Sequence, residues 1–269
     1  MELLHERETE QAIGLIFEVR NQMGGGWSEE IYHQALVENF REHGIPTLQK
    51  PRRSLIHRGV EIYVFEPDII AWDKVIFELK VLPDFKGKDF PSRNYAQTIH
   101  YLKLFEKNLG ILINFAHSKV GIKRLAYEPP EMEIYEDYDR IRSHLSDSDR
   151  QILLKVRQII LNLGKRYETG YSEIVYRKII AVELAHHGIK CISDVNITAQ
   201  WKGKRVGNQT TQHMFVEDRF LLLVRATLDA PPTYDYIKTR TYLKALGIKV
   251  GLVINFGRNE LQIIGTEIR

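Results

Sequence analysis

Two acidic residues and one lysine stand out on an otherwise apolar stretch of the chain. Asp68 precedes a short β-branched run, and Glu78 and Lys80 interrupt the run that follows it. Side chains alternate along a strand, so Glu78 and Lys80 share one face. Two carboxylates beside one ammonium group can hold a hard divalent cation and position a water molecule next to it. The alternative for the same residues is a salt-bridge ladder on the protein surface.

Whether the aspartate joins the other two residues depends on the register of a predicted β-hairpin. The polar residues 72–74 separate two apolar runs, which is typical of a hairpin turn. We expect a three-residue loop, which pairs Ala71 with Val75. Asp68 then lies opposite Glu78, on the same face. A two-residue loop would send the aspartate to the opposite face, because a slip of one residue inverts every side chain.

The predicted elements around the hairpin indicate a sheet flanked by helices. Periodic apolar residues predict helices over residues 9–23, 28–43 and 93–106. Strand-like segments cover residues 47–57, 60–65, 110–115 and 120–126, and residues 82–91 are expected to form a loop. This order of helices and strands is typical of an α+β or α/β fold.

Two further polar residues lie on the predicted helices. Glu29 precedes Tyr32 by three positions, so it lies on the apolar stripe of the second helix rather than on its solvent side. A carboxylate there has another explanation, because acids in a first turn offset the helix dipole. Gln97 lies one turn before Tyr101 on the third helix. Glutamine is also common on helix surfaces, so its type alone does not indicate a role.

The composition is that of an ordinary globular protein, and it excludes several kinds of site. The single cysteine, Cys191, excludes a disulfide within the chain and any zinc site built from cysteines. No apolar run approaches the roughly 18 residues of a membrane span, and residues 1–10 are too charged for a signal peptide. We therefore expect a cytoplasmic protein without a membrane partner. The formal net charge of +3 permits a nucleic-acid partner.

The second half of the chain repeats the first. Residues 26–32 recur as residues 170–176, at an offset of 170 − 26 = 144 positions. Residues 110–115 recur as residues 251–256, at an offset of 251 − 110 = 141 positions. Because order and spacing are both kept, the sequence predicts a tandem duplication of one domain. We expect two domains, residues 1–127 and residues 148–269, joined by a linker of residues 128–147.

The two copies differ where chemistry would take place. The second copy has other residues at four positions: His213, Leu223, Arg225 and Lys238 replace Asp68, Glu78, Lys80 and Gln97. Only Glu173 keeps its counterpart, Glu29. Cations and a leucine cannot bind a divalent metal, so we expect the second copy to be inert. Glu173 is expected to form an ion pair with Arg225 instead.

Four motifs together resemble a known family. In order they are Gly26-x-x-Glu29-x-x-Tyr32, Pro67-Asp68 followed by Glu78-Leu79-Lys80, Gln97-x-x-x-Tyr101, and Gly110-x-Leu112-Ile113-Asn114-Phe115. This set resembles the GxxExxY proteins, a branch of the PD-(D/E)XK nuclease superfamily. The resemblance spans about residues 9–126, and a weaker one spans about residues 148–267. It implies an α/β protein with two restriction-endonuclease-like domains, each a central mixed sheet flanked by helices.

The resemblance also implies roles for individual residues. The implied ligands of Mg²⁺ or Mn²⁺ are Asp68, Glu78, the carbonyl of Leu79, and Glu29. Lys80 would orient or deprotonate the attacking water. Gln97 would position a water molecule or a phosphate group. Tyr32 and Tyr101, in contrast, are expected to pack in the core rather than to take part in catalysis.

The implied activity is that of a metal-dependent nuclease, either an endo- or an exonuclease, with its active site in the first domain. DNA is the expected substrate. Phosphodiester hydrolysis needs positive charge where the transition state accumulates negative charge, and it needs an activated nucleophile. The alternative is a catalytically inactive nucleic-acid-binding or scaffold protein of nuclease ancestry. With either function, the two domains could pack as an intramolecular pseudo-dimer.

Two basic stretches could contact phosphate groups. The first contains Lys50, Arg52, Arg53, His57 and Arg58, and the second contains Lys202, Lys204 and Arg205. Residues 195–216 contain no acidic residue. Contacts with phosphates would confer affinity without sequence preference. The alternative is that these charges protect exposed strand edges.

Overall fold

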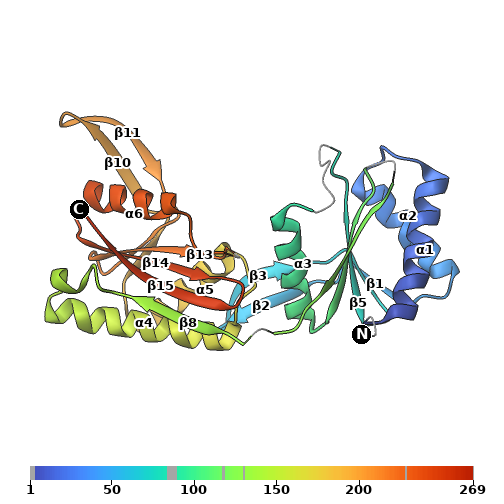
Figure 1. The fold of residues 1–269 in the computed structure, drawn as a ribbon, viewed down its shortest axis with the longest axis horizontal. Coiled ribbons are helices and arrows are strands. Elements are labelled where there is room, and N and C mark those ends of the chain that lie inside the picture. The colour runs from blue at the N-terminus through green and yellow to red at the C-terminus, as the bar shows by residue number, and fades with distance from the viewer. Residues whose placement is uncertain (1–3, 84–89, 117–118, 130, 228, 269) are drawn as a thin grey trace. The chain divides into compact units, whose positions relative to one another are not determined.

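The chain folds as two compact units, drawn in Figure 1. The structure is a computed structural model, and it describes residues 4–83, 90–116, 119–129, 131–227 and 229–268. Unit 1 consists of Met1–Leu55 and Tyr63–Glu128. Unit 2 consists of Ile56–Ile62 and Pro129–Arg269. Most of the expected loop, residues 84–89, lies outside the described residues.

Unit 1 is a five-stranded mixed sheet with helices on both faces. Its elements are α1 (Glu6–Met23), α2 (Glu29–Glu42), β1 (Thr47–Gln49), β4 (Ile69–Ala71), β5 (Val75–Lys80), α3 (Ser92–Phe105), β6 (Leu109–Asn114) and β7 (Gly121–Ala126). The strand order is β1-β4-β5-β6-β7, and only β5 and β6 are parallel. A parallel pair needs a crossover connection, which α3 supplies. Helices α1 and α2 cover one face of the sheet, and α3 covers the other (Figure 1).

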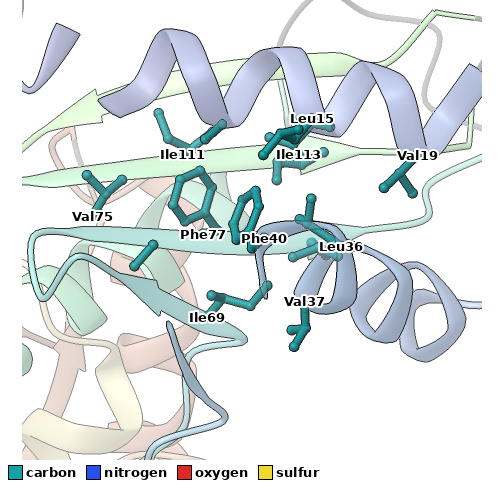
Figure 2. Close-up of a cluster of buried hydrophobic side chains, with 14 of the residues drawn as sticks. Leu15, Val19, Leu36, Val37, Phe40, Ile69, Val75, Phe77, Ile111 and Ile113 are labelled. Atoms are coloured by element: carbon teal, nitrogen blue, oxygen red, sulfur yellow. The ribbon is translucent and has the colours of Figure 1, made fainter. Parts of the chain in front are cut away.

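The apolar core of unit 1 explains why the hairpin strand has one purely apolar face. Figure 2 shows Val75 and Phe77 of β5 beside Ile111 of β6, facing the helices α1 and α2. The Phe40 ring of α2 meets the Phe77 ring edge-on, with centroids 5.4 Å apart. Leu79 belongs to the same buried cluster. The predicted alternation is therefore confirmed, and Glu78 and Lys80 point to the opposite face.

The opposite face of the sheet lies under α3. A Cβ atom added to Gly110 would lie 2.6 Å from Cγ2 of Thr98, so the helix packs directly on β6 at this point. Gly110 pairs with Ile76 of β5, two residues before Glu78. The polar residues of β5 therefore share their face with α3.

Unit 2 has the same architecture with one strand more. Its main elements are β8 (Glu133–Asp137), η1 (Arg142–His144), α4 (Asp147–Tyr167), α5 (Glu173–His186), β9 (Cys191–Ser193), β10 (Asn196–Trp201), β11 (Lys204–Thr210), β12 (Met214–Val216), β13 (Phe220–Arg225), α6 (Thr233–Leu246), β14 (Val250–Phe256) and β15 (Glu260–Glu267). The six-stranded sheet has the order β8-β15-β14-β13-β12-β9. The expected mixed sheet flanked by helices is thus confirmed in both units.

Two aromatic residues of the repeated motifs pack in the same way in both units. Tyr32 stacks on Phe115, with ring centroids 4.4 Å apart. Tyr176 stacks on Phe256, with centroids 3.8 Å apart. Each tyrosine hydroxyl donates a hydrogen bond to a backbone carbonyl. The acceptor is Gly24 in unit 1 and Glu168 in unit 2. These residues hold the second helix of each unit on its sheet, so the predicted packing role of Tyr32 is confirmed.

The structure differs from the expected organisation at the segment expected to be a linker. Residues 133–137 form β8, which pairs in parallel with β15 at the edge of the sheet. Acidic residues on an edge strand discourage pairing with other chains, and this composition also resembles that of a linker. Ser146 then begins α4 with a capping box closed by Asp149. Among the described residues, no helix combines the length and apolar character needed to cross a membrane.

A second difference concerns a hairpin that the sequence assigns to the first domain. Strands β2 (Arg53–His57) and β3 (Val60–Phe65) form a separate two-stranded sheet, and Ile56–Ile62 at its tip belongs to unit 2. There His57 is buried, with Nε2 2.7 Å from Oε2 of Glu183 and Nδ1 2.8 Å from the hydroxyl of Tyr167. Arg58 donates a hydrogen bond of 2.8 Å to Oε1 of the same glutamate. The tip is therefore part of the interior of unit 2.

Candidate active site

The register of the β4–β5 hairpin places the two acids side by side. Ala71 pairs with Val75, as the three-residue loop predicts. Trp72 and Asp73 have φ angles of 52° and 55°, and the Lys74 N–H donates to the Ala71 carbonyl at 2.9 Å. Two left-handed residues in succession are typical of tight hairpin turns. The same register brings Asp68 opposite Glu78.

Contacts with both the side chain and the backbone carbonyl of Asp68 fix its position. Its Oδ2 accepts a hydrogen bond of 2.7 Å from the backbone N–H of Leu79. Its backbone carbonyl accepts from the N–H of Lys50 at 2.9 Å and lies 3.1 Å from Nε2 of His33. In an antiparallel pair, a residue directs its N–H and its carbonyl to the same side. The Leu79 carbonyl therefore points to the edge where the Asp68 carboxylate lies.

Glu78 is the most deeply buried acid of the group, at 2% exposure. Its Oε1 accepts a hydrogen bond of 2.6 Å from Nζ of Lys80, whereas the buried Oε2 has no hydrogen-bond partner among the described residues. Burial, and then the nearby charge of Asp68, raise the pKa of Glu78 to about 8. An unsatisfied buried carboxylate oxygen is costly, and such sites often serve a ligand. Glu78 therefore has a free oxygen ligand directed into the site.

Lys80 connects the strand acids to the second helix. Its Nζ lies 3.8 Å from Oε1 of Glu29, the first residue of α2. Burial alone lowers the pKa of Lys80, but the carboxylates around it, Glu78 first, outweigh burial and raise the pKa above its usual value. The side chain is therefore an ammonium group at neutral pH. In this state it can orient a water molecule or a phosphate oxygen, but it cannot accept a proton.

Glu29 reaches the site from the opposite face of the sheet. Burial raises its pKa, and the charge of Lys80 opposes this shift. Its side chain is 44% exposed, so it lies at the mouth of the site rather than in its interior. Glu29 is the first residue of α2. From this position its carboxylate can both offset the helix dipole and face Lys80.

Tyr101 of α3 lies near the strand acids, and Gln97 contacts Tyr101. The Gln97 side-chain amide donates a hydrogen bond of 2.9 Å to the Tyr101 hydroxyl. Burial, followed by the charge of Glu78, raises the pKa of Tyr101 far above its ordinary value, so this hydroxyl keeps its proton. Tyr101 is 7% exposed, which agrees with the predicted packing role. Within the described chain, no hydrogen bond joins Gln97 to the acids.

The donors at this site suit a hard divalent cation in their chemistry. Carboxylate and carbonyl oxygens are the ligands that Mg²⁺ and Mn²⁺ prefer. The unsatisfied Oε2 of Glu78 and the raised pKa values of the three acids indicate a site short of positive charge. As the side chains stand, no three His, Cys, Asp or Glu residues in the described part of the chain are arranged to hold a metal ion. In this arrangement the ammonium group of Lys80 provides positive charge beside Glu78 and Glu29.

Two residues lie beside the site that the sequence did not place there, His33 and Lys50. His33 is 4% exposed, and its ring contacts the Asp68 carbonyl. It follows Glu29 by four positions, so helical spacing could have placed both on one side of α2. Lys50 was expected to contact phosphates. It bonds to Glu30 instead, while its charge also lowers the pKa values of Glu29 and Asp68.

A family comparison agrees with the geometry. A family model described as the PD-(D/E)XK nuclease superfamily matches residues 6–125 and again residues 150–264. The chain belongs to the PD-(D/E)XK nuclease superfamily. The double match supports the predicted tandem duplication, and the two units are restriction-endonuclease-like domains of this superfamily.

The other comparisons add little to this assignment. A solved structure, the crystal structure of SSO0001, is 19% identical and has a TM-score of 0.30. The match covers 36% of this chain and 48% of SSO0001, so the chain spans about half the length of that protein. No curated protein matches the sequence.

The second superfamily domain has lost the acids of the strand. Arg225 takes the place of Lys80 and lies 2.9 Å from Oε2 of Glu173, which confirms the predicted ion pair. Its Nε also donates a hydrogen bond of 2.8 Å to Asp235, a buried acid in the first turn of α6 that sequence analysis did not single out. Leu223 fills the position of Glu78. An arginine thus neutralises two carboxylates where the first domain gathers three acids around a lysine.

His213, at the position of Asp68, should make unit 2 sensitive to acid. It is fully buried between the hydroxyls of Thr211 and Thr239, and burial lowers its pKa to about 3. The nearby charges of Lys238, Arg225 and Arg177 also lower this pKa. The charge of Asp235 raises it. The unfolded chain binds a proton below about pH 6.5, whereas the folded one does not. The stabilisation is therefore complete above pH 6.5 and is lost as the pH falls.

The measurement is urea denaturation at pH 7 and pH 5. We expect the loss of unfolding free energy between these pH values to be about 2 kcal/mol smaller in His213→Gln than in the parent protein. The comparison uses the difference between two pH values, so a constant cost of the substitution cancels. Equal losses in both proteins would contradict the prediction.

Proposed function

We propose that this chain is a metal-dependent nuclease of the GxxExxY type, with its active site in unit 1 and DNA as its substrate. The observation that carries the proposal is the gathering of four side chains at one end of β5: Glu29, Asp68, Glu78 and Lys80. The unsatisfied Oε2 of Glu78 gives this group a reason to bind a cation. The four sequence motifs around these residues support the assignment to this branch of the superfamily.

Each residue has a proposed role. Asp68, Glu78, the Leu79 carbonyl and Glu29 would hold Mg²⁺ or Mn²⁺. When bound, this ion supplies positive charge for the phosphate oxygens and lowers the pKa of a water molecule. Lys80, as an ammonium group, orients the attacking water and stabilises charge on the phosphate. Gln97 would position water or phosphate from α3.

The proton of the attacking water needs an acceptor, and Glu29 is proposed for this role. Lys80 is protonated and Tyr101 keeps its proton, so neither can act as the base. Glu29 is the more exposed of the acids beside Lys80, and its pKa is raised toward the working range of a general base. From the mouth of the site it can pass the proton to bulk water.

The test is a cleavage assay with single- and double-stranded DNA and RNA, in Mg²⁺, Mn²⁺ or EDTA. We expect cleavage of DNA that requires metal and is lost in Asp68→Asn and in Lys80→Met. The matched controls are Asp73→Asn and Lys74→Met, which alter exposed residues of the same hairpin turn. Equal residual activity in all variants would indicate a contaminating nuclease. Absence of cleavage with every substrate and metal would favour the inactive binding or scaffold protein.

A further inference from the structure

The β10–β11 hairpin of unit 2 is a two-stranded ribbon with almost no interior. Every residue of β11 is exposed, and in β10 only Ile197 is buried. In Figure 1 the ribbon, in orange, extends beyond α6 and the sheet of unit 2. Its base is anchored because Val195 and Ile197 pack against Tyr242 and Leu243. Isolated two-stranded hairpins are marginally stable in water, so a ribbon of this kind calls for a partner.

The tip of this ribbon carries positive charge that is not neutralised. Lys202, Lys204 and Arg205 lie at or next to the turn, and residues 195–216 contain no acidic residue. Within the described part of the chain, no carboxylate forms an ion pair with these three residues. The aromatic ring of Trp201 is 67% exposed, and Nζ of Lys202 lies 5.6 Å from its centroid. Exposed cations beside an exposed aromatic ring suit the phosphates and bases of a nucleic acid.

The equivalent hairpin of the first copy provides a comparison. The turns Arg58-Gly59 and Lys202-Gly203 are 202 − 58 = 144 positions apart, as the duplication requires. Their φ angles are 50° and 77° in the first and 48° and 76° in the second, so the turns have the same shape. The basic residues of the first hairpin are paired with carboxylates: Arg52 with Glu66, Arg53 with Glu106, and Arg58 with Glu183. The expectation that the first stretch contacts phosphates is therefore not supported, whereas the second stretch remains available.

A second copy of the chain is a less suitable partner for the ribbon. The first hairpin is held by Glu183 of α5, which His57 and Arg58 already engage. The corresponding position of α2 is 183 − 144 = 39, where Asn39 carries no charge. Neither helix therefore offers a free carboxylate at the place where such a hairpin docks.

We propose that the β10–β11 hairpin is an arm that binds double-stranded DNA. Lys202, Lys204 and Arg205 contact phosphates, and Trp201 lies against the sugars and bases between them. A two-stranded ribbon fits the major groove of a duplex, and beyond its anchored base the described residues of this ribbon are exposed on both faces. This proposal rests on the proposed function, because the arm binds the substrate that unit 1 cleaves. It gives a role to a domain whose own acids are lost.

The test measures binding of a labelled 25-base-pair duplex by fluorescence anisotropy in EDTA, so that no cleavage takes place. The arm variant carries Lys202→Ala, Lys204→Ala and Arg205→Ala. The control carries Lys155→Ala, Lys165→Ala and Arg166→Ala, exposed residues of α4 with the same total charge. We expect the arm variant to bind at least about tenfold more weakly, with a salt slope reduced by about 2–3, since each phosphate contact contributes about 0.9. The control should bind like the parent protein.

Two further readouts separate this proposal from the nuclease proposal. Quenching of tryptophan fluorescence by the duplex should be lost in Trp201→Phe, whatever the state of the metal site. Adding the arm substitutions to Glu78→Gln should weaken duplex binding by the same factor as adding them to the parent protein, because the arm lies in unit 2. Unchanged affinity and salt slope in a folded arm variant would overturn the proposal, even if cleavage is observed. Tighter binding of single strands than of the duplex through the same residues would also overturn it.

Discussion

Replacing Glu78 with glutamine is expected to lower metal-dependent cleavage at least about a hundredfold. Glutamine keeps the size of the side chain but loses the charge that a cation requires. The loss falls on Oε2, the buried oxygen for which the described part of the chain offers no hydrogen-bond partner. Initial rates with saturating metal and duplex DNA measure the effect. Cleavage within tenfold of the parent rate would contradict the proposed site.

The matched control and a stability measurement distinguish loss of chemistry from loss of fold. Glu106→Gln makes the same change at an exposed carboxylate and should cleave at the parent rate. The pKa of Glu78 is raised in the folded protein, so its ionisation destabilises the fold. The unfolding free energy therefore declines as the pH rises from about 4.5 and levels off above about 8. At pH 8.5 in EDTA, Glu78→Gln should therefore have an unfolding free energy no lower than that of the parent. A clear drop would mean that lost activity reports misfolding.

Replacing Arg225 with alanine is expected to lower the unfolding free energy of unit 2 by about 3 kcal/mol. The guanidinium group bridges Glu173 and Asp235, and the Asp235 side chain is only 2% exposed. The hydrogen bonds that Arg225 donates to the Asp235 carboxylate raise the pKa of the guanidinium group, so it is always charged. Without it, two carboxylates remain in a partly buried place with no cation between them. Urea denaturation at pH 7, with hydrogen exchange in β13 and α6 as a local probe, measures the effect.

Two comparisons show whether the cost comes from the buried charges. Lys190→Ala removes an exposed ion pair with Asp218 and should change the unfolding free energy by less than about 1 kcal/mol. Adding Glu173→Gln and Asp235→Asn to the Arg225→Ala variant should recover at least half of the loss. If the triple variant is no more stable than Arg225→Ala, the arginine stabilises unit 2 by packing rather than by charge.

Local patterns in the sequence predicted the helices and strands of unit 1, whereas the fold of both units was implied by the family resemblance. Alternation along Val75–Lys80 and the length of the turn determined the register, because a slip of one residue would have turned Glu78 and Lys80 into the apolar cluster and Phe77 away from it. The helices followed from apolar periodicity. Strand β8 was not predicted, because alternating acids on an edge strand resemble a loop, and its pairing partner β15 lies more than a hundred residues away.

The candidate site was predicted in its residue types but not in all of its contacts. Asp68, Glu78 and Lys80 lie within one hairpin, so short-range reasoning could bring them together. His33 and Asp235 act through tertiary contacts with a backbone carbonyl and an arginine, respectively. The burial of His57 against Glu183, 126 positions further along the chain, leaves no local signal in the sequence.

The hairpin tip Ile56–Ile62 is encoded in the first copy but folds within unit 2. Gene duplication normally leaves two modules, either of which a lineage can later discard. Here the deletion of either module would harm the other. Loss of the first copy would take His57 and Arg58 away from Glu183, and loss of the second would leave His57 and Ile62 without the interior that buries them. This shared segment gives natural selection a reason to retain both copies.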